Sequence, residues 1–175
     1  MMTNRPLLSI VCPAYEEEPA LPEFHSVLGR ALERLEKAFE TEVIYVDDGS
    51  RDRTFAVIEQ LALSDRRVRG LSLSRNFGHQ AALTAGLEHA HGDAIVMLDS
   101  DLQHPPELIS RLVAEWQAGF DIVQTIRQDD ENLGWFKRVS SAWFYKLLRR
   151  WSAVEIRPAQ AMIAGERSSW RLDDV

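Results

Sequence analysis

Short apolar runs alternate with amphipathic helical patterns along most of this chain, and this alternation constrains its fold more than any other feature. The apolar runs predict strands over Leu7–Cys12, Val43–Val46, Val68–Leu73, Ala94–Leu98 and Asp121–Ile126. The helical patterns lie between them, over Leu21–Phe39, Asp52–Ser64, Gln80–Ala90 and Pro106–Ala118. Strands that alternate with helices of ten or more residues form crossover units, so we expect an α/β fold with a mostly parallel sheet flanked by helices.

Composition excludes several classes of protein. The chain has 175 residues, enough for one domain with a sizeable core. Its net charge of −7 argues against a general nucleic-acid binder, which needs a basic face. The single cysteine, Cys12, excludes a disulfide framework, and no apolar run is long enough to cross a bilayer. Without a secretory signal pattern either, the sequence predicts a cytoplasmic location.

Two acids directly after the Ala94–Leu98 run are the strongest chemical signal. Asp99 and Asp101 would follow the carboxyl end of a buried parallel strand, where open α/β sheets bind their ligands. Mg²⁺ is usually held by one or two carboxylates together with substrate phosphates. The pair therefore indicates a cation that clamps a diphosphate. The alternative is that both are solvated loop acids that cap the helix beginning near Pro106.

Other polar side chains follow the earlier strands. Tyr15 offers a ring for stacking on a base, and Asp47 or Asp48 offers a carboxylate that can accept a hydrogen bond from a base or a ribose. Arg75 can pair with a phosphate, and Asn76 can donate or accept beside it. The alternatives are an ordinary turn before a helix for the two acids and a solvated surface side chain for the arginine.

Missing motifs narrow the function further. No glycine-rich turn follows the first strand, and the chain has no P-loop, nucleophile-elbow or H-E-x-x-H sequence. The histidines do not cluster at metal-ligand spacing. His104 lies beside the proposed cation site, whereas the other histidines are interpreted as surface or helix-start residues: His25, His79, His89 and His91.

Four segments together resemble family 2 glycosyltransferases of the GT-A fold. They are Ser9–Glu17, Val46–Ser50, Ser74–His79 and Asp99–Pro106. Within that family the chain looks like the polyprenyl-phosphate glycosyltransferases, the relatives of dolichyl-phosphate mannose synthase and of bacterial undecaprenyl-phosphate glucosyltransferases. The resemblance runs from residue 7 to about 155. It implies a GT-A type, Rossmann-like fold and a cytoplasmic enzyme that sits peripherally at the inner face of the membrane.

The resemblance also implies ligands and site residues. The segment Ser74–Gly78 looks like the bacterial branch, which implies a UDP-sugar donor more than GDP-mannose, with Mg²⁺ or Mn²⁺ as cofactor. The implied catalytic residues are Asp99, Asp101 and Arg127, and the implied metal ligands are Asp99, Asp101 and Gln103. The implied nucleotide-sugar contacts are Pro13, Tyr15, Glu17, Asp47, Asp48, Arg75, Asn76, Asp99 and Ser100, with Asp48 at the base.

The resemblance has two departures. The usual Tyr-Asn-Glu of the first loop is Tyr15-Glu16-Glu17 here, and the match stops near Ile156–Pro158. We therefore divide the chain into a nucleotide-sugar-binding core (1–134), a basic amphipathic helix (135–156) and a tail (157–175) that looks divergent, frameshifted or truncated. Tryptophan and arginine together in 135–156 favour contact with a membrane surface over packing on the sheet.

The implied reaction is an inverting, metal-dependent transfer of a hexose to a polyprenyl phosphate. The cation would act as a Lewis acid on the departing diphosphate. The main alternative is a catalytically inactive fragment that only binds nucleotide-sugar or membrane. A phosphotransferase with a D-x-D nucleophile is disfavoured, because such enzymes place that pair after their first strand rather than their fourth. The sequence gives no indication of the oligomeric state.

Overall fold

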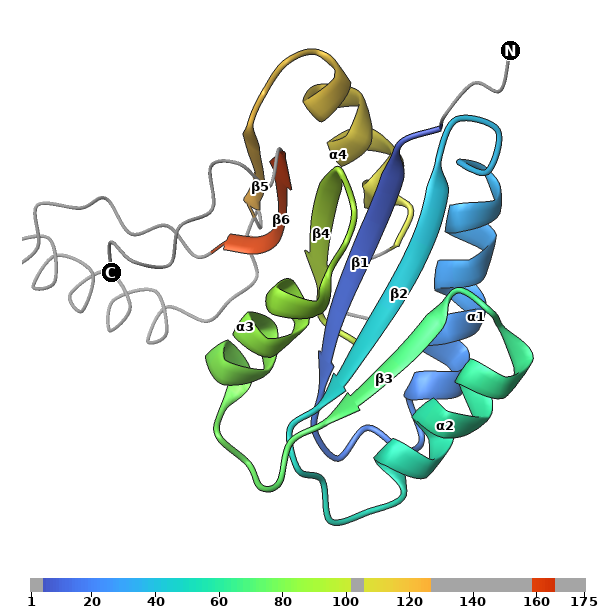
Figure 1. Cartoon of the computed structure of the whole chain (residues 1–175), viewed down its shortest axis with the longest axis vertical. Helices are drawn as coiled ribbons and strands as arrows, with labels where there is room; N and C mark the ends of the chain where they lie inside the picture. Colours follow the sequence, from blue (N-terminus) through green and yellow to red (C-terminus); the bar gives the residue numbers. More distant parts are fainter. Residues whose placement is uncertain (1–4, 102–105, 127–158, 166–175) are drawn as a thin grey trace, which may run out of the picture. The chain divides into compact units, whose positions relative to one another are not determined.

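A computed structural model describes residues 5–101, 106–126 and 159–165 of the chain (Figure 1). The predictions for Gln103, His104, Arg127 and the basic helix 135–156 lie outside these residues. The elements are β1 (Leu7–Ala14), α1 (Leu21–Glu33), β2 (Glu40–Asp47), α2 (Thr54–Ser64), β3 (Val68–Ser72), α3 (His79–His89), β4 (Ala94–Leu98), α4 (Leu108–Gln117), β5 (Ile122–Ile126) and β6 (Ala159–Gly165). Among the described residues, no helix is long and apolar enough to span a membrane.

The sheet has the strand order β3-β2-β1-β4-β6-β5. β1 pairs in parallel with both β2 and β4, and β2 pairs in parallel with β3, which confirms the predicted mostly parallel sheet. The strand order reverses between β1 and β4, because the chain moves outward through β2 and β3 and then returns to the other side of β1. Ligands of open α/β sheets bind at such a switch point, outside the carboxyl ends of the strands.

β6 was not predicted. It pairs antiparallel with β4, with Ala94 opposite Gly165 and Leu98 opposite Ala161. The segment Ala159–Gly165 is mostly alanine, methionine and glycine, and Ile163 is its single β-branched residue, so it lacks the alternation and the β-branched content that mark a strand locally. Its conformation follows from hydrogen bonding to the edge of β4, a partner about sixty residues away in the sequence.

Several element ends differ from the prediction by one to a few residues, and the ends of β1 and α1 have a clear physical reason. β1 continues through Pro13 to Ala14, where Pro13 lies opposite Val46 of β2. α1 ends at Glu33, although the helical period continues to Phe39. Beyond α1 the backbone includes hydrogen bonds between residues three apart, as in a tight turn. For example, the Ala38 N–H donates to the Leu35 carbonyl oxygen at 2.9 Å. Phe39 is nevertheless buried, with its ring centroid 6.2 Å from that of Trp116.

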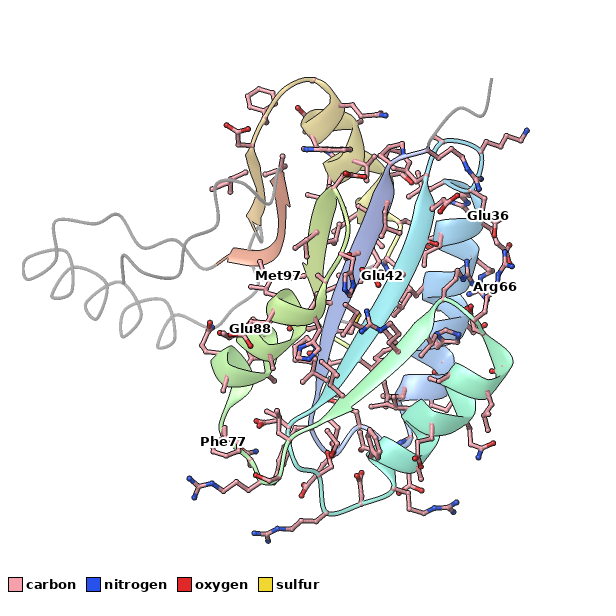
Figure 2. The ribbon with its side chains drawn as sticks, in the orientation of Figure 1. Glu36, Glu42, Arg66, Phe77, Glu88 and Met97 are labelled. Atoms are coloured by element: carbon pink, nitrogen blue, oxygen red, sulfur yellow. The ribbon has the colours of Figure 1, made fainter. Side chains whose placement is uncertain are left out.

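Each face of the sheet has its own apolar cluster. Alternate residues of β1 separate them: Ile10 and Cys12 join the cluster packed by α1, α2 and α4, whereas Val11 joins the cluster packed by α3. Met97 of β4, labelled in Figure 2, packs against the second cluster. Gly86 lets α3 lie close to the sheet, since a Cβ there would be 2.3 Å from Val11 Cγ1. This close packing brings the beginning of α3 to the ligand-binding edge.

A half-buried chain of polar side chains begins at α1 and includes Tyr45 of the sheet. His25 Nδ1 lies 3.1 Å from the hydroxyl oxygen of Tyr45, and His25 Nε2 lies 3.5 Å from Asp65 Oδ2. Asp65 in turn accepts hydrogen bonds from the guanidinium of Arg67. Burial lowers the pKa of His25 and outweighs the opposite effect of Asp65, while Arg67 lowers it further. The folded protein therefore favours the neutral imidazole.

We expect this histidine to make folding stability depend on pH. Its pKa is lowered in the folded state, so below its ordinary value of 6.5 the unfolded chain takes up a proton that the folded chain resists. The free energy of unfolding should fall as pH drops from 7 to 5, and His25→Gln should reduce that slope. Urea unfolding at several pH values measures both. His89→Gln, at the exposed end of α3, is the control; an identical slope in wild type and His25→Gln would contradict the prediction.

Candidate functional site

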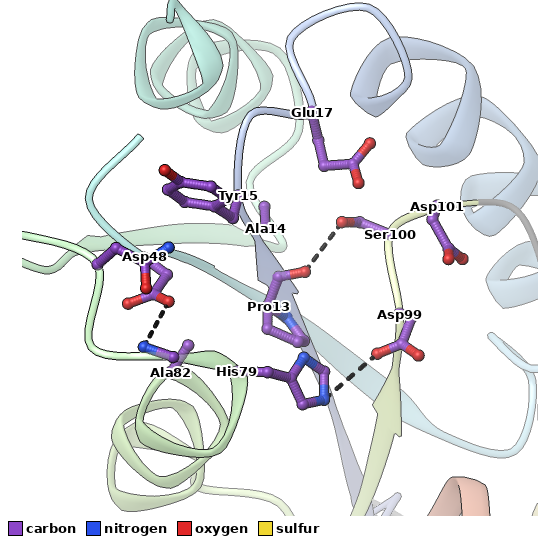
Figure 3. A pocket seen from close by; sticks show the side chains of 12 residues that line it. Pro13, Ala14, Tyr15, Glu17, Asp48, His79, Ala82, Asp99, Ser100 and Asp101 are labelled. Atoms are coloured by element: carbon purple, nitrogen blue, oxygen red, sulfur yellow. Dashed lines mark hydrogen bonds and ion pairs between the residues drawn. The ribbon is translucent and has the colours of Figure 1, made fainter. Parts of the chain in front are cut away.

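A pocket of about 330 Å³ opens at the carboxyl ends of β1, β2 and β4, beside the beginning of α3 (Figure 3). It lies at the switch point of the strand order, where a ligand is expected. Its lining residues are Pro13, Ala14, Tyr15, Glu17, Asp48, Asn76, Gly78, His79, Ala82, Asp99, Ser100 and Asp101. Loops separated by more than eighty residues in the sequence therefore meet around one cavity.

Most of the predicted site residues within the described part of the chain line this pocket. They are Pro13, Tyr15, Glu17, Asp48, Asn76, Asp99, Ser100 and Asp101. Asp47 and Arg75 are not part of the lining. Gln103 and Arg127 lie outside the described residues. His79, interpreted from the sequence as a surface or helix-start residue, does line the pocket.

Asp47, the last residue of β2, and Asp48, directly after it, have different surroundings although each is only 3 % exposed. Asp47 accepts hydrogen bonds from the Ser50 backbone N–H and the Ser72 hydroxyl, both at 3.1 Å, so its carboxylate closes the turn and ties β2 to β3. Asp48 accepts the backbone N–H groups of Phe77 (2.8 Å) and Gly78 (2.9 Å). Asp48 thus shapes the loop that carries Asn76 into the pocket, and it lines the pocket itself.

Gly49 lets the loops after β2 and β3 approach each other. Its φ of 66° lies in the left-handed region, and a Cβ there would be 2.3 Å from the carbonyl carbon of Arg75. The Arg75 guanidinium lies over the ring of Phe77, 4.7 Å from its centroid. Arg75 thus makes a cation–π contact with Phe77 and is not among the residues that line the pocket.

Backbone hydrogen bonds hold the loop after β1. Successive N–H groups donate to side chains of the next loop: Glu16 to Ser50 Oγ (2.9 Å), Glu17 to Thr54 Oγ1 (2.9 Å) and Glu18 to Asp52 Oδ2 (3.3 Å). Glu16 has a φ of 56°, a conformation in which asparagine is several-fold enriched. Glu16 replaces the asparagine of Tyr-Asn-Glu at a position whose backbone conformation favours asparagine. The hydrogen bond from Glu16 to Ser50 comes from the backbone N–H, which any residue but proline supplies.

The loop after β4 is fastened to β1 by Ser100. Its hydroxyl is buried and donates to the carbonyl oxygen of Pro13 at 2.9 Å. On either side of it, Asp99 and Asp101 line the pocket, and Glu17 lies across from them (Figure 3). Burial raises the pKa of Glu17, and the negative charge of Asp101 raises it further. Carboxylates crowded in this way repel one another, and a bound cation would relieve the repulsion.

The carboxylate oxygens of these residues are the type of ligand that a hard divalent cation prefers. Mg²⁺ and Mn²⁺ prefer oxygen ligands, and Mg²⁺ commonly uses only one or two carboxylates along with phosphate oxygens and water. Within the described ranges, no group of three acidic, histidine or cysteine side chains is arranged to hold a metal ion by itself. Two carboxylates, such as those of Asp99 and Asp101, are the number that Mg²⁺ commonly uses when phosphate oxygens supply further ligands.

Four lining residues were not predicted from the sequence, namely Ala14, Gly78, His79 and Ala82, and His79 is the ionisable one among them. It is the first residue of α3, and its Nε2 lies 3.6 Å from Asp99 Oδ1. Its position directly after the loop that follows β3 was the available signal, since that loop ends at the same edge of the sheet as Asp99. No local pattern predicts the contact with Asp99 itself, because that contact depends on how α3 packs on the sheet.

Comparison with known proteins gives a consistent result. The family described as "Glycosyl transferase family 2" matches residues 9–169. The chain is 45 % identical over 149 residues to a bactoprenol glucosyl transferase of Shigella phage SfX, covering 85 % of this chain and 48 % of the relative. It is 39 % identical over 165 residues to an undecaprenyl-phosphate 4-deoxy-4-formamido-L-arabinose transferase of Shewanella sediminis, covering 94 % and 49 %. The chain spans about half the length of these curated relatives.

A solved structure shows the same fold. The mannosyltransferase PcManGT from Pyrobaculum calidifontis, in complex with GDP-Man and Mn²⁺, superposes with a TM-score of 0.64 at 23 % identity. The match covers 93 % of this chain and 45 % of the mannosyltransferase. The predicted GT-A type fold is thereby confirmed.

Proposed function

Because the chain belongs to glycosyl transferase family 2, we propose that its pocket binds a nucleoside-diphosphate sugar and that the hexose is transferred, with inversion, to a polyprenyl phosphate. The observation that carries the proposal is the meeting of Asp48, Asp99 and Asp101 around one cavity at the switch point of the sheet. The lipid acceptor is inferred from the relatives, whose names specify bactoprenol and undecaprenyl phosphate.

The two ends of the pocket suit the two ends of such a donor. Tyr15, Asp48 and Asn76 supply a ring and hydrogen-bonding groups for the base and ribose. Asp99 and Asp101 would hold Mg²⁺ or Mn²⁺ against the diphosphate. When bound, the cation supplies Lewis-acid stabilisation of the charge on the departing diphosphate. Mn²⁺ in the similar mannosyltransferase structure is consistent with this assignment.

The acceptor needs little help from a base. A phosphate monoester has a second pKa near 6 and is mostly dianionic at pH 7. Its oxygen attacks the anomeric carbon as the bond from that carbon to the diphosphate breaks, which inverts the configuration. We further propose that the basic segment 135–156 contacts the membrane surface where this lipid resides, and that the protein is peripheral at the inner face.

Titration of the full chain with nucleotides tests the donor part of the proposal. We expect UDP to bind, Mn²⁺ to increase its affinity, and GDP to bind more weakly than UDP, as the resemblance of Ser74–Gly78 to the bacterial branch of the family implies. Calorimetry with UDP and with GDP, each with and without Mn²⁺, measures this. Absence of UDP binding would overturn the proposal, and a preference for GDP would move the donor to GDP-mannose.

Transfer of labelled glucose from UDP-glucose to polyprenyl phosphate tests the acceptor part. Turnover by the full chain would support transferase activity. UDP binding without turnover would instead favour the alternative of a chain that binds the donor but does not transfer it.

A further inference from the structure

His79 lines the pocket between the residues that follow β2 and those that follow β4. Gly78, just before it, donates its backbone N–H to Asp48 Oδ2 at 2.9 Å and has a φ of 98° as the cap of α3. The carbonyl of Gly78 accepts the Ala82 N–H at 3.2 Å, which begins the helix. The backbone of His79 is therefore held from the β2 side, while its side chain extends toward the loop after β4 (Figure 3).

The imidazole contacts one oxygen of the acidic pair. His79 Nε2 lies 3.6 Å from Asp99 Oδ1, an electrostatic contact longer than a hydrogen bond. The side chains are 51 % and 36 % exposed, so both remain accessible to a ligand in the pocket. An accessible pair of this kind adds little to folding stability. Its effect should appear in ligand binding rather than in stability.

We propose that His79 is a positioning residue: it orients the Asp99 carboxylate so that this group can engage the cation and diphosphate of the donor. The inference rests on the proposed function and adds to it a residue outside the acidic motif. Side chains that contact a metal-binding carboxylate from outside commonly set its orientation and so affect metal affinity.

Three variants of the full chain test this: His79→Ala, His79→Gln and, as control, His89→Ala. His89 lies at the other end of α3, where its ring contacts the Ala85 carbonyl of its own helix. The quantity measured is the ratio of UDP dissociation constants without and with Mn²⁺. We expect His79→Ala to reduce this ratio by about 10-fold, the lower end for such outer residues, with metal-free UDP affinity unchanged. His79→Gln, which keeps an N–H donor, should recover most of it, and His89→Ala should match wild type.

The other possible results distinguish failure of the His79 role from failure of the proposed function. An unchanged ratio in His79→Ala would overturn the role of His79 and leave the proposed function intact. Equal weakening with and without Mn²⁺ would show direct contact with the nucleotide and would also overturn positioning. No UDP binding, or no Mn²⁺ effect, in the wild-type protein would instead overturn the donor and cation proposals, and this inference with them. Thermal unfolding of each variant shows whether it is folded.

Discussion

Asp101→Ala is expected to reduce the affinity for UDP in the presence of Mn²⁺ by about 100-fold and to abolish measurable sugar transfer. Only two carboxylates, those of Asp99 and Asp101, are proposed to join the cation to the protein, and Lewis-acid stabilisation of a departing diphosphate is worth several kcal/mol. Calorimetry with and without Mn²⁺ measures the first effect, and transfer of labelled glucose measures the second. Metal-free UDP affinity should change little.

The same substitution should not destabilise the fold. Asp101 raises the pKa of the neighbouring Glu17, which shows that the two carboxylates repel each other in the folded state. Removing one charge relieves that repulsion and so offsets the loss of contacts that Asp101 itself makes, and the melting temperature of Asp101→Ala should stay close to that of wild type. Asp121→Ala, an exposed acid outside the pocket lining, is the control for charge. A large drop in melting temperature, or unchanged Mn²⁺-dependent binding, would contradict the assignment.

Gly49→Ala is expected to have the largest effect on stability. The left-handed φ of 66° costs an L-residue about 1–2 kcal/mol. The added Cβ would also lie 2.3 Å from backbone atoms of Arg75, and overpacking of this kind typically costs about 1–3 kcal/mol more. For a chain of this size each kcal/mol lowers the melting temperature by about 2–4 °C. Thermal and urea unfolding measure the total.

Gly119→Ala separates the two contributions. Gly119 has a φ of 100°, but a Cβ there would meet nothing within 4 Å. Its substitution should therefore show the backbone cost alone. The excess in Gly49→Ala then reports the packing of the loop after β2 on the loop after β3, and UDP affinity should fall with it, since that loop carries Asn76. Equal destabilisation by the two substitutions would show that the Arg75 backbone moves aside without cost.

Local patterns predicted much of this fold because its elements are local in origin. The buried run Ala94–Leu98 has the same bounds in sequence and structure, and every predicted strand is present. The end of α1 was misplaced because the spacing of Leu35 and Phe39 is set by burial, which a turn satisfies as well as a helix does. Apolar periodicity reports which residues are buried, and it reports backbone conformation only indirectly.

The candidate site was predictable for a related reason. Parallel strands bring their carboxyl ends to one edge of the sheet, so acids that follow different strands, such as Asp48 after β2 and Asp99 after β4, lie at the same edge. The sequence could not separate Asp47 from Asp48, since the two are adjacent and both are buried. Their roles diverge because one carboxylate faces the Ser50 turn and the other faces the N–H groups of the loop after β3.

The sequence by itself determined the order of strands and helices, the parallel sheet and the loops on which the acidic side chains lie. The individual strands and helices follow from patterns within a few residues, and the parallel pairing follows from the helical crossover between one strand and the next. Only the tertiary structure decided that β6 extends the sheet beside β4, that Gly49 lies against Arg75 and that His79 faces Asp99. Those contacts join residues from about twenty to seventy positions apart, so their geometry is set by packing of whole elements and leaves no local pattern in the chain.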